Sequence, residues 1–336
     1  MLFYENLEDI IFSRHENLSD IPDELIIISG YLGPAPMERL NELNFKVTVI
    51  GGMYPAGMKK RLWNSLEKIK KENKDLKLFF SKTEIHSKIY MWRKNEKILG
   101  ALIGSANFSS NGLRTDYRES LAEVTNDSFN PLINYFKLIK ENSTETPYLA
   151  QYEDNISLDG YQPPDVDELK YSCELPLYSI RNKQVSEKSG LNWGLSDAHV
   201  AEGDAYITLT KKIIENNPYL FHPYDDEYIS PTKRSRNSDP IEIIWDDGVI
   251  MAASFEGTQK IDEKRYPKQI ASYSAELPVL NGEKISKKSI LGRYLRKRLN
   301  VSINHRITLK DLEKYGRTSI TFSLIEPGIY YADFSI

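Results

Sequence analysis

The chain has 336 residues, of which 40% are hydrophobic and 27% are charged, and its formal net charge is -4. This composition is typical of a folded globular protein, and the length is sufficient for two domains. The small net charge excludes a polybasic tail or an acidic solvating chain. The single cysteine, Cys173, excludes an intrachain disulfide framework and a zinc cluster built on cysteines.

The N-terminal stretch MLFYENLEDI has no feature of a secretory leader. It carries acidic residues where a leader needs Lys or Arg, and no apolar segment follows it. The longest apolar runs, such as residues 25–28, are far too short to span a bilayer. We therefore expect a cytoplasmic protein with no membrane partner.

Strands and helices alternate in the first half of the chain. Short apolar runs predict strands, and apolar residues repeated at helical spacing predict helices between them. This alternation predicts an α/β domain with a mixed sheet and helices on both faces. The expected strands are 24–29, 45–52, 76–81, 84–92, 96–104 and 120–125, and the expected helices are 36–43, 56–73 and 130–142.

The pattern changes in the middle of the chain. Residues 143–176 are rich in Pro, Asp and Tyr and show no hydrophobic periodicity, which is typical of a linker. We therefore predict two domains, an α/β domain over residues 1–172 and a second domain over residues 173–336.

The second half has mostly strand patterns. Two segments read as hairpins because apolar runs flank an Asp-Asp-Gly or Glu-Pro-Gly turn. Two helical stretches interrupt the strands, so we expect a small, mostly-β barrel with helices at its ends. The hairpins are 241–251 and 317–336, and the helices lie near 204–217 and 286–299.

His86 and Lys88 are the first candidates for chemistry. They stand two residues apart in a predicted strand, so both side chains project from one face. The next predicted strand ends at Gly104-Ser105-Ala106-Asn107, a turn of small residues. If the two strands form a hairpin, an imidazole, an ammonium and an amide converge. A His-x-Lys pair alone has a structural alternative, in which the two side chains simply face solvent.

This set of groups suits a phosphodiester. Lys88 and Asn107 can stabilise charge on the oxygens of a pentacoordinate phosphorus, and the same turn exposes Ser105. Imidazole titrates near neutral pH, so His86 can attack phosphorus or protonate the leaving oxygen. A carboxylate that orients the imidazole is also needed. Glu119 is the first candidate for it, and Glu123 is a weaker one because it lies inside the following strand.

The phospholipase D superfamily has an active-site signature that this chain resembles. The matching elements are His86-x-Lys88, Gly104-Ser105-x-Asn107-Phe108 and the later Glu119. The resemblance covers residues 24–125. One position differs, because the superfamily has Asp five residues after the lysine and this chain has Arg93. The same departure occurs in phospholipase D-like type II restriction endonucleases of the BfiI and NgoFVII type, which are bacterial enzymes.

That resemblance implies a shared active site. The reaction needs one histidine as nucleophile and a second as general acid, but only His86 of the five histidines stands in a His-x-Lys motif. The implied assembly is a homodimer with one catalytic centre on its twofold axis. One His86 would form a phosphohistidine, the other would protonate the leaving oxygen, and water would hydrolyse the intermediate. Lys88 and Asn107 of both chains would stabilise the charge, so no metal or other cofactor is expected.

Two further features have ordinary explanations beside functional ones. Glu72-Asn73-Lys74 matches the tail of a magnesium nuclease motif, but a solvated helix terminus is the favoured explanation. Residues 284–298 carry seven basic residues and no acidic one. They form either a phosphate-binding surface or a helix with a solvated basic face and Ile290, Leu291 and Leu295 packed inward.

Three loops of the second half carry side chains that suit DNA. Arg and Lys can read guanine, and Asn and Gln can read adenine, in the major groove. Each loop alone is equally well explained as an ordinary solvated loop, and Trp193 as a core residue. The candidates are Arg181, Lys183, Gln184, Lys188, Asn192, Trp193, Lys233, Arg234, Arg236, Lys260, Lys264, Arg265 and Lys268.

The second half also resembles the B3-like, EcoRII-N-like DNA-binding domain of these enzymes. The shared features are the SGLNWG stretch, the Asp-Asp-Gly hairpin, the basic helix and the final hairpin. In that family two arms enter the major groove from a pseudobarrel. The resemblance implies an N-arm within 181–193 and a C-arm within 257–268, with the loop at 233–236 as an alternative.

The sequence therefore predicts a homodimeric, metal-independent, site-specific DNA endonuclease. The resemblance implies double-stranded DNA as substrate, a cognate methyltransferase and, as in some relatives, an ATPase partner. One alternative is a phosphodiesterase of another substrate class, such as a non-specific nuclease or a phospholipid hydrolase. Another is a DNA-binding protein with an inactive nuclease domain.

Overall fold

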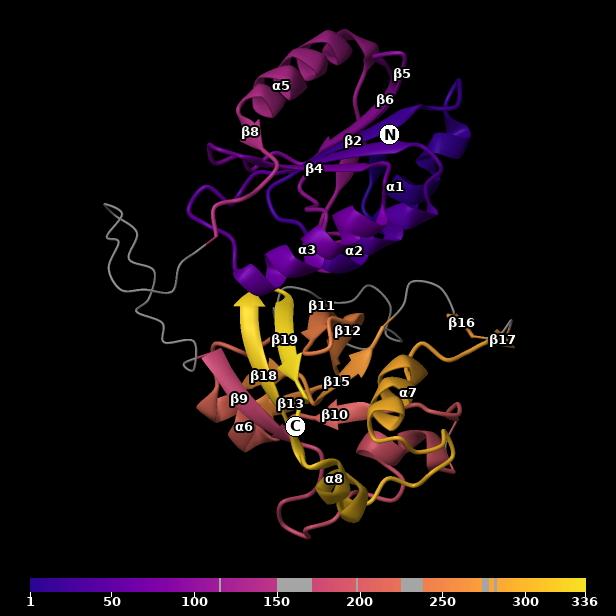
Figure 1. Cartoon of the computed structure of the whole chain (residues 1–336), viewed down its shortest axis with the longest axis vertical. Coiled ribbons are helices and arrows are strands. Elements are labelled where there is room, and N and C mark those ends of the chain that lie inside the picture. The colour runs from indigo at the N-terminus through magenta and orange to yellow at the C-terminus, as the bar shows by residue number, and fades with distance from the viewer. Residues whose placement is uncertain (115, 150–170, 198, 225–237, 274–277, 281–282) are drawn as a thin grey trace. The chain divides into compact units, whose positions relative to one another are not determined.

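Figure 1 shows a computed structural model of the chain. It describes residues 1–114, 116–149, 171–197, 199–224, 238–273, 278–280 and 283–336. The chain divides into two compact units, Met1–Asp154 and Asn155–Ile336.

The described part of the first unit contains an eight-stranded mixed sheet in the order β1-β7-β6-β5-β2-β3-β4-β8. β2, β3 and β4 run parallel, whereas β5 is antiparallel to β2 and β6 is antiparallel to β5. The central strands are nearly continuous apolar runs because both faces of the sheet are covered. The strands are β1 (Leu2–Phe3), β2 (Glu24–Ser29), β3 (Lys46–Gly51), β4 (Leu76–Ser81), β5 (Ile89–Lys94), β6 (Lys97–Gly104), β7 (Leu121–Glu123) and β8 (Ser143–Thr144).

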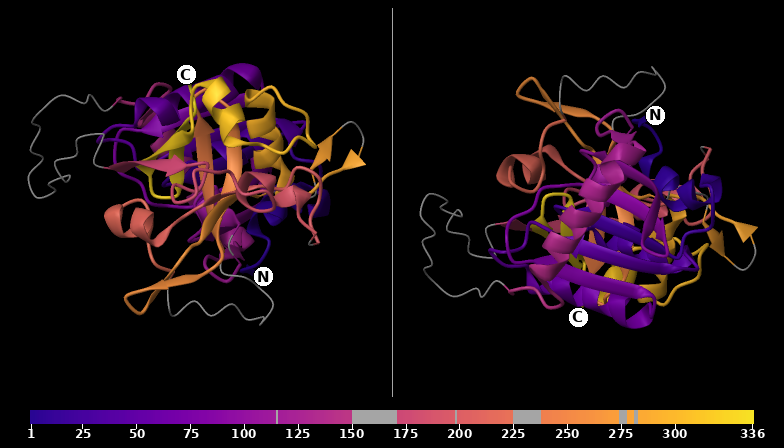
Figure 2. Two further views of the ribbon diagram at one scale, coloured as in Figure 1. Left: turned by 90° about the horizontal axis from the view of Figure 1, so that it is seen from below. Right: turned by 90° about the horizontal axis from the view of Figure 1, so that it is seen from above.

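Helices cover both faces of this sheet. On one face α5 buries Phe136 and Ile139 against apolar side chains of β2, β3, β5 and β6, and Figure 2 shows α5 lying across the strands. On the other face lie α1, α2 and α3 (Figure 1). The helices are α1 (Leu7–Ser13), α2 (Pro34–Arg39), α3 (Lys60–Glu72), α4 (Ser110–Leu113) and α5 (Phe129–Glu141), with short 3-10 turns η1 (Arg14–Asn17), η2 (Leu40–Glu42) and η3 (Asn126–Ser128).

Two details of the first unit differ from the sequence-based expectation. The strand expected at 84–92 begins only at Ile89, because the preceding residues make isolated hydrogen bonds rather than a ladder. Ile85 N–H donates to the Gly52 carbonyl at 2.9 Å, and Gly104 N–H donates to the Lys88 carbonyl at 3.2 Å. The helix expected at 56–73 begins at Lys60.

The described part of the second unit is mostly β. Its main sheet has the order β10-β15-β12-β11-β19-β18-β9, in which only β11 and β19 pair in parallel. Two hairpins, β13–β14 and β16–β17, stand outside this sheet. The strands are β9 (Ser172–Pro176), β10 (Tyr206–Thr208), β11 (Ser238–Trp245), β12 (Ile250–Glu256), β13 (Gln259–Ile261), β14 (Lys264–Tyr266), β15 (Gln269–Ser272), β16 (Val279–Leu280), β17 (Glu283–Lys284), β18 (Ser319–Glu326) and β19 (Ile329–Asp333).

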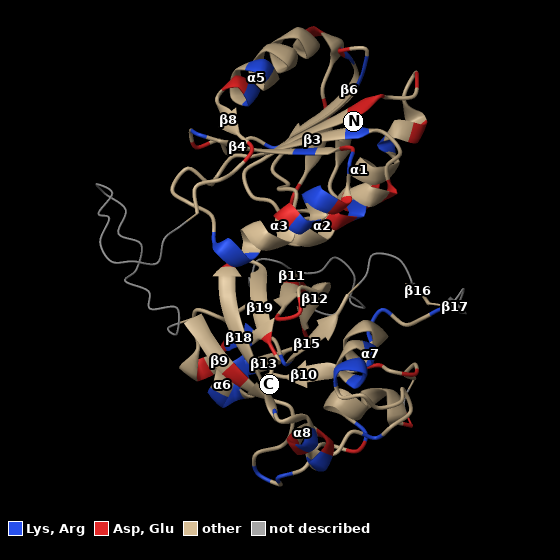
Figure 3. Cartoon of the chain, viewed as in Figure 1, with Lys and Arg blue, Asp and Glu red and all other residues tan. Residues whose placement is uncertain are grey.

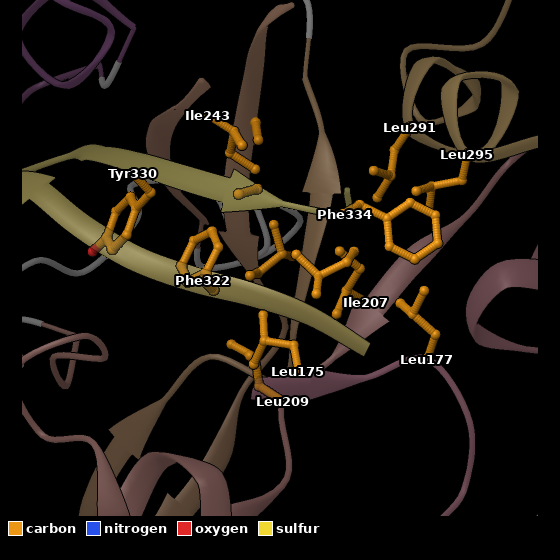
Figure 4. Close-up of a cluster of buried hydrophobic side chains, with 14 of the residues drawn as sticks. Leu175, Leu177, Ile207, Leu209, Ile243, Leu291, Leu295, Phe322, Tyr330 and Phe334 are labelled. Atoms are coloured by element: carbon orange, nitrogen blue, oxygen red, sulfur yellow. The ribbon is translucent and has the colours of Figure 1, made fainter. Parts of the chain in front are cut away.

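One apolar core holds the second unit together. Side chains of the main sheet, such as Leu175, Ile207 and Phe322, pack with Leu291 and Leu295 of α7 (Figure 4). The helical segments are η5 (Gly190–Leu195), α6 (Lys211–Asn216), α7 (Ser289–Arg298) and α8 (Leu309–Tyr315).

Two expectations about secondary structure in the middle of the chain differ in part from the structure. The region 143–176, read as irregular, contains β8 at one end and β9 at the other, because β8 pairs with β4 and β9 pairs with β18. The stretch 204–217 is helical only over Lys211–Asn216. Its β-branched and aromatic Tyr206–Thr208 form β10, which pairs with β15 and buries Ile207.

Candidate active site

The candidate catalytic residues lie at one end of the central strands of the first sheet, which is called the edge below. β2 and β3 end there, β6 runs in the same direction as β2 and also ends there, and the antiparallel β5 begins there. Segments that precede β5 and follow β6 therefore meet at this edge. In α/β sheets the carboxyl ends of the strands are the usual place for a ligand site.

His86 and Lys88 are in direct contact at this edge. The Lys88 Nζ lies 2.8 Å from Nδ1 and 3.2 Å from Nε2 of the His86 ring. An ammonium can only donate, so the ring nitrogen that it approaches accepts with its lone pair. Ser87 points to the opposite side, where its hydroxyl lies 2.6 Å from the hydroxyl of Tyr135 on α5. The predicted alternation of side chains is therefore present although the segment is not a regular strand.

Lys88 is a buried cation. Its side chain is 4% exposed, and its ammonium also donates to the His86 carbonyl at 2.7 Å. Burial lowers the pKa of Lys88, and the negative charge of Glu119 acts in the opposite direction. A desolvated ammonium interacts more strongly with an arriving phosphate than a solvated one does.

Asn107 and His86 both lie close to Gly30. A methyl group placed on Gly30 would lie 3.1 Å from Asn107 Oδ1 and 3.5 Å from His86 Cδ2. Asn107 Oδ1 accepts from the Tyr31 backbone N–H at 3.1 Å. The structure thus brings His86, Lys88 and Asn107 together. Sequence reasoning gave the turn at 29–31 no part in the site, although it follows the carboxyl end of a predicted buried strand, where ligand sites are usual.

Ser105 and Glu119 flank this group of three. Ser105 N–H donates to the Ser120 carbonyl at 3.0 Å, and the Ser105 hydroxyl accepts from the Ser120 N–H at 3.1 Å. A side chain on Gly104 would collide with the Ser120 carbonyl oxygen, so a glycine is required there. These contacts hold Glu119 beside the loop of Asn107. Among the described residues, no hydrogen bond joins Glu119 to His86.

Glu123 and Arg93 have other partners. Glu123 forms ion pairs with Arg14 and with the amino group of Met1, so it is not available to His86. Arg93 Nε donates to Glu24 Oε2 at 2.6 Å at the opposite edge of the sheet. Five residues of strand place Arg93 about 16 Å from Lys88. Its side chain therefore does not reach the candidate active site.

The described ranges contain no group of three or more His, Cys, Asp or Glu side chains that could hold a metal ion. Glu72 is the last residue of α3 and Asn73 is its C-cap, as expected for a helix terminus. None of the helices that the structure describes is both long enough and apolar enough to cross a membrane.

The predicted N-arm is an exposed loop between β9 and η5. Arg181, Lys183, Gln184 and Lys188 are all exposed there. The loop is closed by a hydrogen bond from the Ser179 N–H to the Gln184 carbonyl at 2.8 Å. Lys188 forms an ion pair with Asp197. These four side chains lie where a ligand of the second unit could reach them.

Asn192 is a correction to the predicted DNA contacts. It is 0% exposed, and its amide is fully used inside the second unit. Nδ2 donates to the carbonyls of Ser186 and Ile307 at 2.9 and 2.8 Å, and Oδ1 accepts from the Ile307 N–H at 2.9 Å. Asn192 therefore anchors the end of the N-arm loop and cannot read a base. Trp193 is half-buried against Tyr206, with ring centroids 5.6 Å apart.

The other predicted loops divide between described and undescribed residues. Lys233, Arg234 and Arg236 lie outside the described residues. The predicted C-arm contains the hairpin β13–β14, on which Lys260 and Lys264 are exposed and Arg265 is half-buried. Lys268 follows the hairpin and is exposed.

The basic stretch 284–298 is not a uniformly solvated face. Leu291 and Leu295 of α7 are buried, as the helical alternative predicts. Arg296 is buried too, and Arg298 donates to Asp246 Oδ2 at 2.8 Å. Lys288 forms an ion pair with Glu256. Figure 3 shows the Lys and Arg positions along α7, but several of these charges are committed to internal partners.

Both units match family models of one class of protein. Residues 5–157 match the NgoFVII restriction endonuclease N-terminal PLD domain, and residues 167–326 match the NgoFVII C-terminal B3-like DNA-binding domain. The class is thus a type II nuclease of the phospholipase D superfamily that carries its own DNA-binding domain. The chain belongs to the NgoFVII restriction endonuclease family. The predicted fold, an α/β phospholipase D-like domain followed by a mostly-β B3-like pseudobarrel, is confirmed.

Solved structures resemble parts of the chain at low sequence identity. NucT from Helicobacter pylori is 16% identical over 43% of this chain and 96% of that chain, with a TM-score of 0.32. Nuc, a phospholipase D family member from Salmonella typhimurium, is 9% identical over 42% and 90%, with a TM-score of 0.28. Polyphosphate kinase from Porphyromonas gingivalis is 10% identical over 47% of this chain and 26% of its own, with a TM-score of 0.30. The comparison with curated proteins gives no match.

Proposed function

We propose that this site-specific nuclease cleaves DNA without a metal, through a phosphohistidine formed on His86. The observation that carries the proposal is the contact between the His86 ring and the Lys88 ammonium, with Asn107 and His86 both close to Gly30. A nucleophile, a desolvated cation and an amide at one sheet edge suit attack on a phosphodiester. The family assignment supplies DNA as the substrate.

The proposed reaction has two steps. In the first, an imidazole nitrogen of His86 bonds to phosphorus while the bond to the leaving oxygen breaks. In the second, a water oxygen bonds to phosphorus and the nitrogen–phosphorus bond breaks. Lys88 and Asn107 hold the non-bridging oxygens in both steps, and Ser105 keeps their loop in place. We keep Glu119 as the proposed carboxylate that orients the imidazole once DNA is bound, since among the described residues no hydrogen bond joins it to His86 in the free chain.

The proton donor comes from a second copy of the chain. The leaving oxygen needs a proton in the first step, and water must lose one in the second. The sequence has a single His-x-Lys motif, at His86. We therefore propose a homodimer in which His86 of the partner subunit protonates the leaving oxygen in the first step and accepts a proton from water in the second.

The second unit delivers the site-specific contacts in this proposal. The N-arm contributes Arg181, Lys183, Gln184 and Lys188, and the C-arm contributes Lys260, Lys264, Arg265 and Lys268. We place the domain boundary at residue 172, within the linker region 143–176. A cognate methyltransferase protects the host sites, and an ATPase subunit is a candidate partner.

Plasmid cleavage in EDTA tests the proposal. Wild-type protein should give discrete fragments in EDTA, and His86→Ala should lose cleavage by ~10⁴-fold or more. His222→Ala, which removes an exposed histidine of the second unit, should cleave like wild type. Cleavage that appears only after Mg²⁺ is added would contradict the metal-free mechanism. DNA binding without any cleavage by the wild type would favour an inactive nuclease domain.

Co-expression tests the shared site. Randomly mixed dimers of wild-type and His86→Ala chains, present in equal amounts, should have about one quarter of the wild-type activity, because only dimers with two intact histidines complete the reaction. About half of the activity would show that each chain acts alone.

A further inference from the structure

The turn that follows β2 holds the loop of Asn107 through one buried hydroxyl. Ser29 is 0% exposed. Its hydroxyl donates to the Tyr31 carbonyl at 2.6 Å and accepts from the Phe108 N–H at 2.8 Å. The Ser29 side chain therefore links the turn at 29–31 directly to the residue after Asn107.

Further contacts hold the backbone on both sides of Asn107. Leu32 and Phe108 form a parallel bridge, and the Gly33 N–H donates to the Phe108 carbonyl at 2.8 Å. Before Asn107, the hydroxyl of the buried Tyr90 donates to the Ala106 carbonyl at 2.8 Å. The backbone of the Asn107 loop is thus fixed immediately before and after the functional residue.

The same turn fixes the side-chain amide. Asn107 Oδ1 accepts from the Tyr31 N–H at 3.1 Å. A rotated amide would set its NH₂ group against this N–H, and two donors cannot bond. Among the described residues nothing accepts from Asn107 Nδ2. The amide therefore presents its donor side to an incoming phosphate oxygen.

Gly30 keeps the space between the two functional side chains open. A methyl group on Gly30 would lie 3.1 Å from Asn107 Oδ1, 3.2 Å from Met53 Cγ and 3.5 Å from His86 Cδ2. The first two distances are tighter than ordinary van der Waals contact. A methyl group at position 30 would crowd Asn107 Oδ1 and the Met53 side chain and would touch the His86 ring.

We infer that Ser29 and Gly30 are positioning residues, which hold Asn107 with its NH₂ group turned toward the scissile phosphate beside His86. Ser29 touches neither substrate nor the reacting atoms and acts through Tyr31 and Phe108. The inference rests on the proposed function, because it assumes that Asn107 contacts the phosphate. It adds that the turn after β2 determines how well Asn107 contacts the phosphate.

A double-mutant cycle on Ser29 and Asn107 tests this inference. Single-turnover cleavage of plasmid DNA would be measured for Ser29→Ala, Asn107→Ala and the double variant. Ser29→Ala should lower the cleavage rate by ~10- to 100-fold with little change in DNA affinity, because the recognition contacts belong to the second unit. In the Asn107→Ala background the same change should have almost no effect, since the side chain that it positions is already absent.

Two further variants and one control variant complete the test. Ser29→Cys keeps a weak donor and acceptor of similar size and should restore part of the rate lost in Ser29→Ala. Gly30→Ala should lower the rate while the circular dichroism spectrum stays that of the wild type. Ser65→Ala is the matched control, because Ser65 is also buried but bonds only to the Arg61 carbonyl within α3; it should cleave like wild type.

The outcomes separate this inference from the proposed function. Full activity of Asn107→Ala would overturn the catalytic role of Asn107 and with it this inference, whereas the proposed function fails only if His86→Ala still cleaves or the wild type needs Mg²⁺. If Asn107→Ala is impaired but Ser29→Ala and Gly30→Ala cleave like wild type, the positioning role is wrong. An equal loss on Ser29→Ala with and without Asn107 would show that Ser29 merely supports the fold.

Discussion

Each unit of the molecule buries a cation, but the two cations have different surroundings. Lys88 in the first unit is 4% exposed, and Arg296 in the second is 2% exposed. Burial lowers the pKa of both, and the charge of Arg293 adds to the effect on Arg296. Lys88 contacts a solvent-exposed histidine at the edge of a sheet.

Arg296 contacts only internal groups among the described residues. Its guanidinium lies 3.3 Å from the Gly292 carbonyl and 3.4 Å from both the His305 carbonyl and Asn192 Oδ1. Burial of a charge therefore does not by itself mark a functional site. The neighbours distinguish the two cases, because Arg296 contacts carbonyl and amide oxygens of the core whereas Lys88 contacts a reactive imidazole.

Replacing Lys88 should have the largest effect, a loss of cleavage activity without a loss of stability. Lys88→Met should lower the cleavage rate by ~10²- to 10³-fold, because the phosphate loses its cation. The free energy of unfolding should stay equal or rise, because a methionine fills the same space without the cost of desolvation. Cleavage assays and urea unfolding of the same preparation measure the two effects. Parallel loss of activity and stability would indicate that Lys88 is structural.

The opposite pattern is expected for Asn192. Asn192→Ala leaves the Ile307 N–H and the carbonyls of Ser186 and Ile307 without their buried partner. Each unsatisfied buried group costs about 1–3 kcal/mol, so the loss of all three bonds should cost the second unit about 3 kcal/mol of stability or more. Urea unfolding monitored in the second unit measures it.

Exposed Asn182 of the same loop supplies the control for Asn192. Asn182→Ala should leave the stability almost unchanged. Normal stability of Asn192→Ala combined with weakened DNA binding would restore Asn192 as a base-reading residue and contradict its anchoring role.

The candidate residues of the first unit were predicted more accurately than those of the second, and the reason is physical. In the first unit, strand alternation and a hairpin turn are local rules, and they bring His86 and Lys88 to the end of the strand that delivers Asn107. The turn at 29–31 was missed because its contact with Phe108 spans 79 positions in sequence. No local pattern encodes such a contact.

In the second unit the candidates were chosen by residue type alone. An asparagine in a polar loop has the same composition whether it faces DNA or the core. Asn192 is buried because its partners Ile307 and Arg296 lie more than 100 positions away in sequence. The exposed Arg181 and Lys183 follow no stronger pattern than Asn192 does, so residue type could not separate them.

The pH dependence of Lys88 sharpens the contrast between function and stability. Its pKa lies below the ordinary value of 10.5, so the ammonium is lost at a lower pH than in a free lysine. We expect the cleavage rate to fall ~10-fold per pH unit above this lowered pKa. Between the lowered pKa and 10.5 the unfolded chain binds more protons than the folded one, so stability should rise with pH there.

Comparison with Lys88→Met isolates this effect. The difference in unfolding free energy between the wild type and Lys88→Met should shrink as pH rises through that window, because the wild type no longer buries a charge. Urea unfolding of both proteins across the alkaline range provides the measurement. A pH-independent difference would argue against a lowered pKa of Lys88.

The smallest effects are expected in the N-arm loop. Arg181→Ala should weaken DNA binding by about 3- to 10-fold without changing stability, because Arg181 is exposed. If Arg181 contacts a phosphate, binding to all sequences weakens and the slope of log K against log salt falls by about 0.9. If it reads a base, only the cognate site is affected and the slope is less changed. Lys212→Ala, at an exposed position of α6, is the matched control and should bind like wild type. Equal binding by the two variants would remove Arg181 from the DNA interface and leave Lys183, Gln184 and Lys188 as the candidates of this loop.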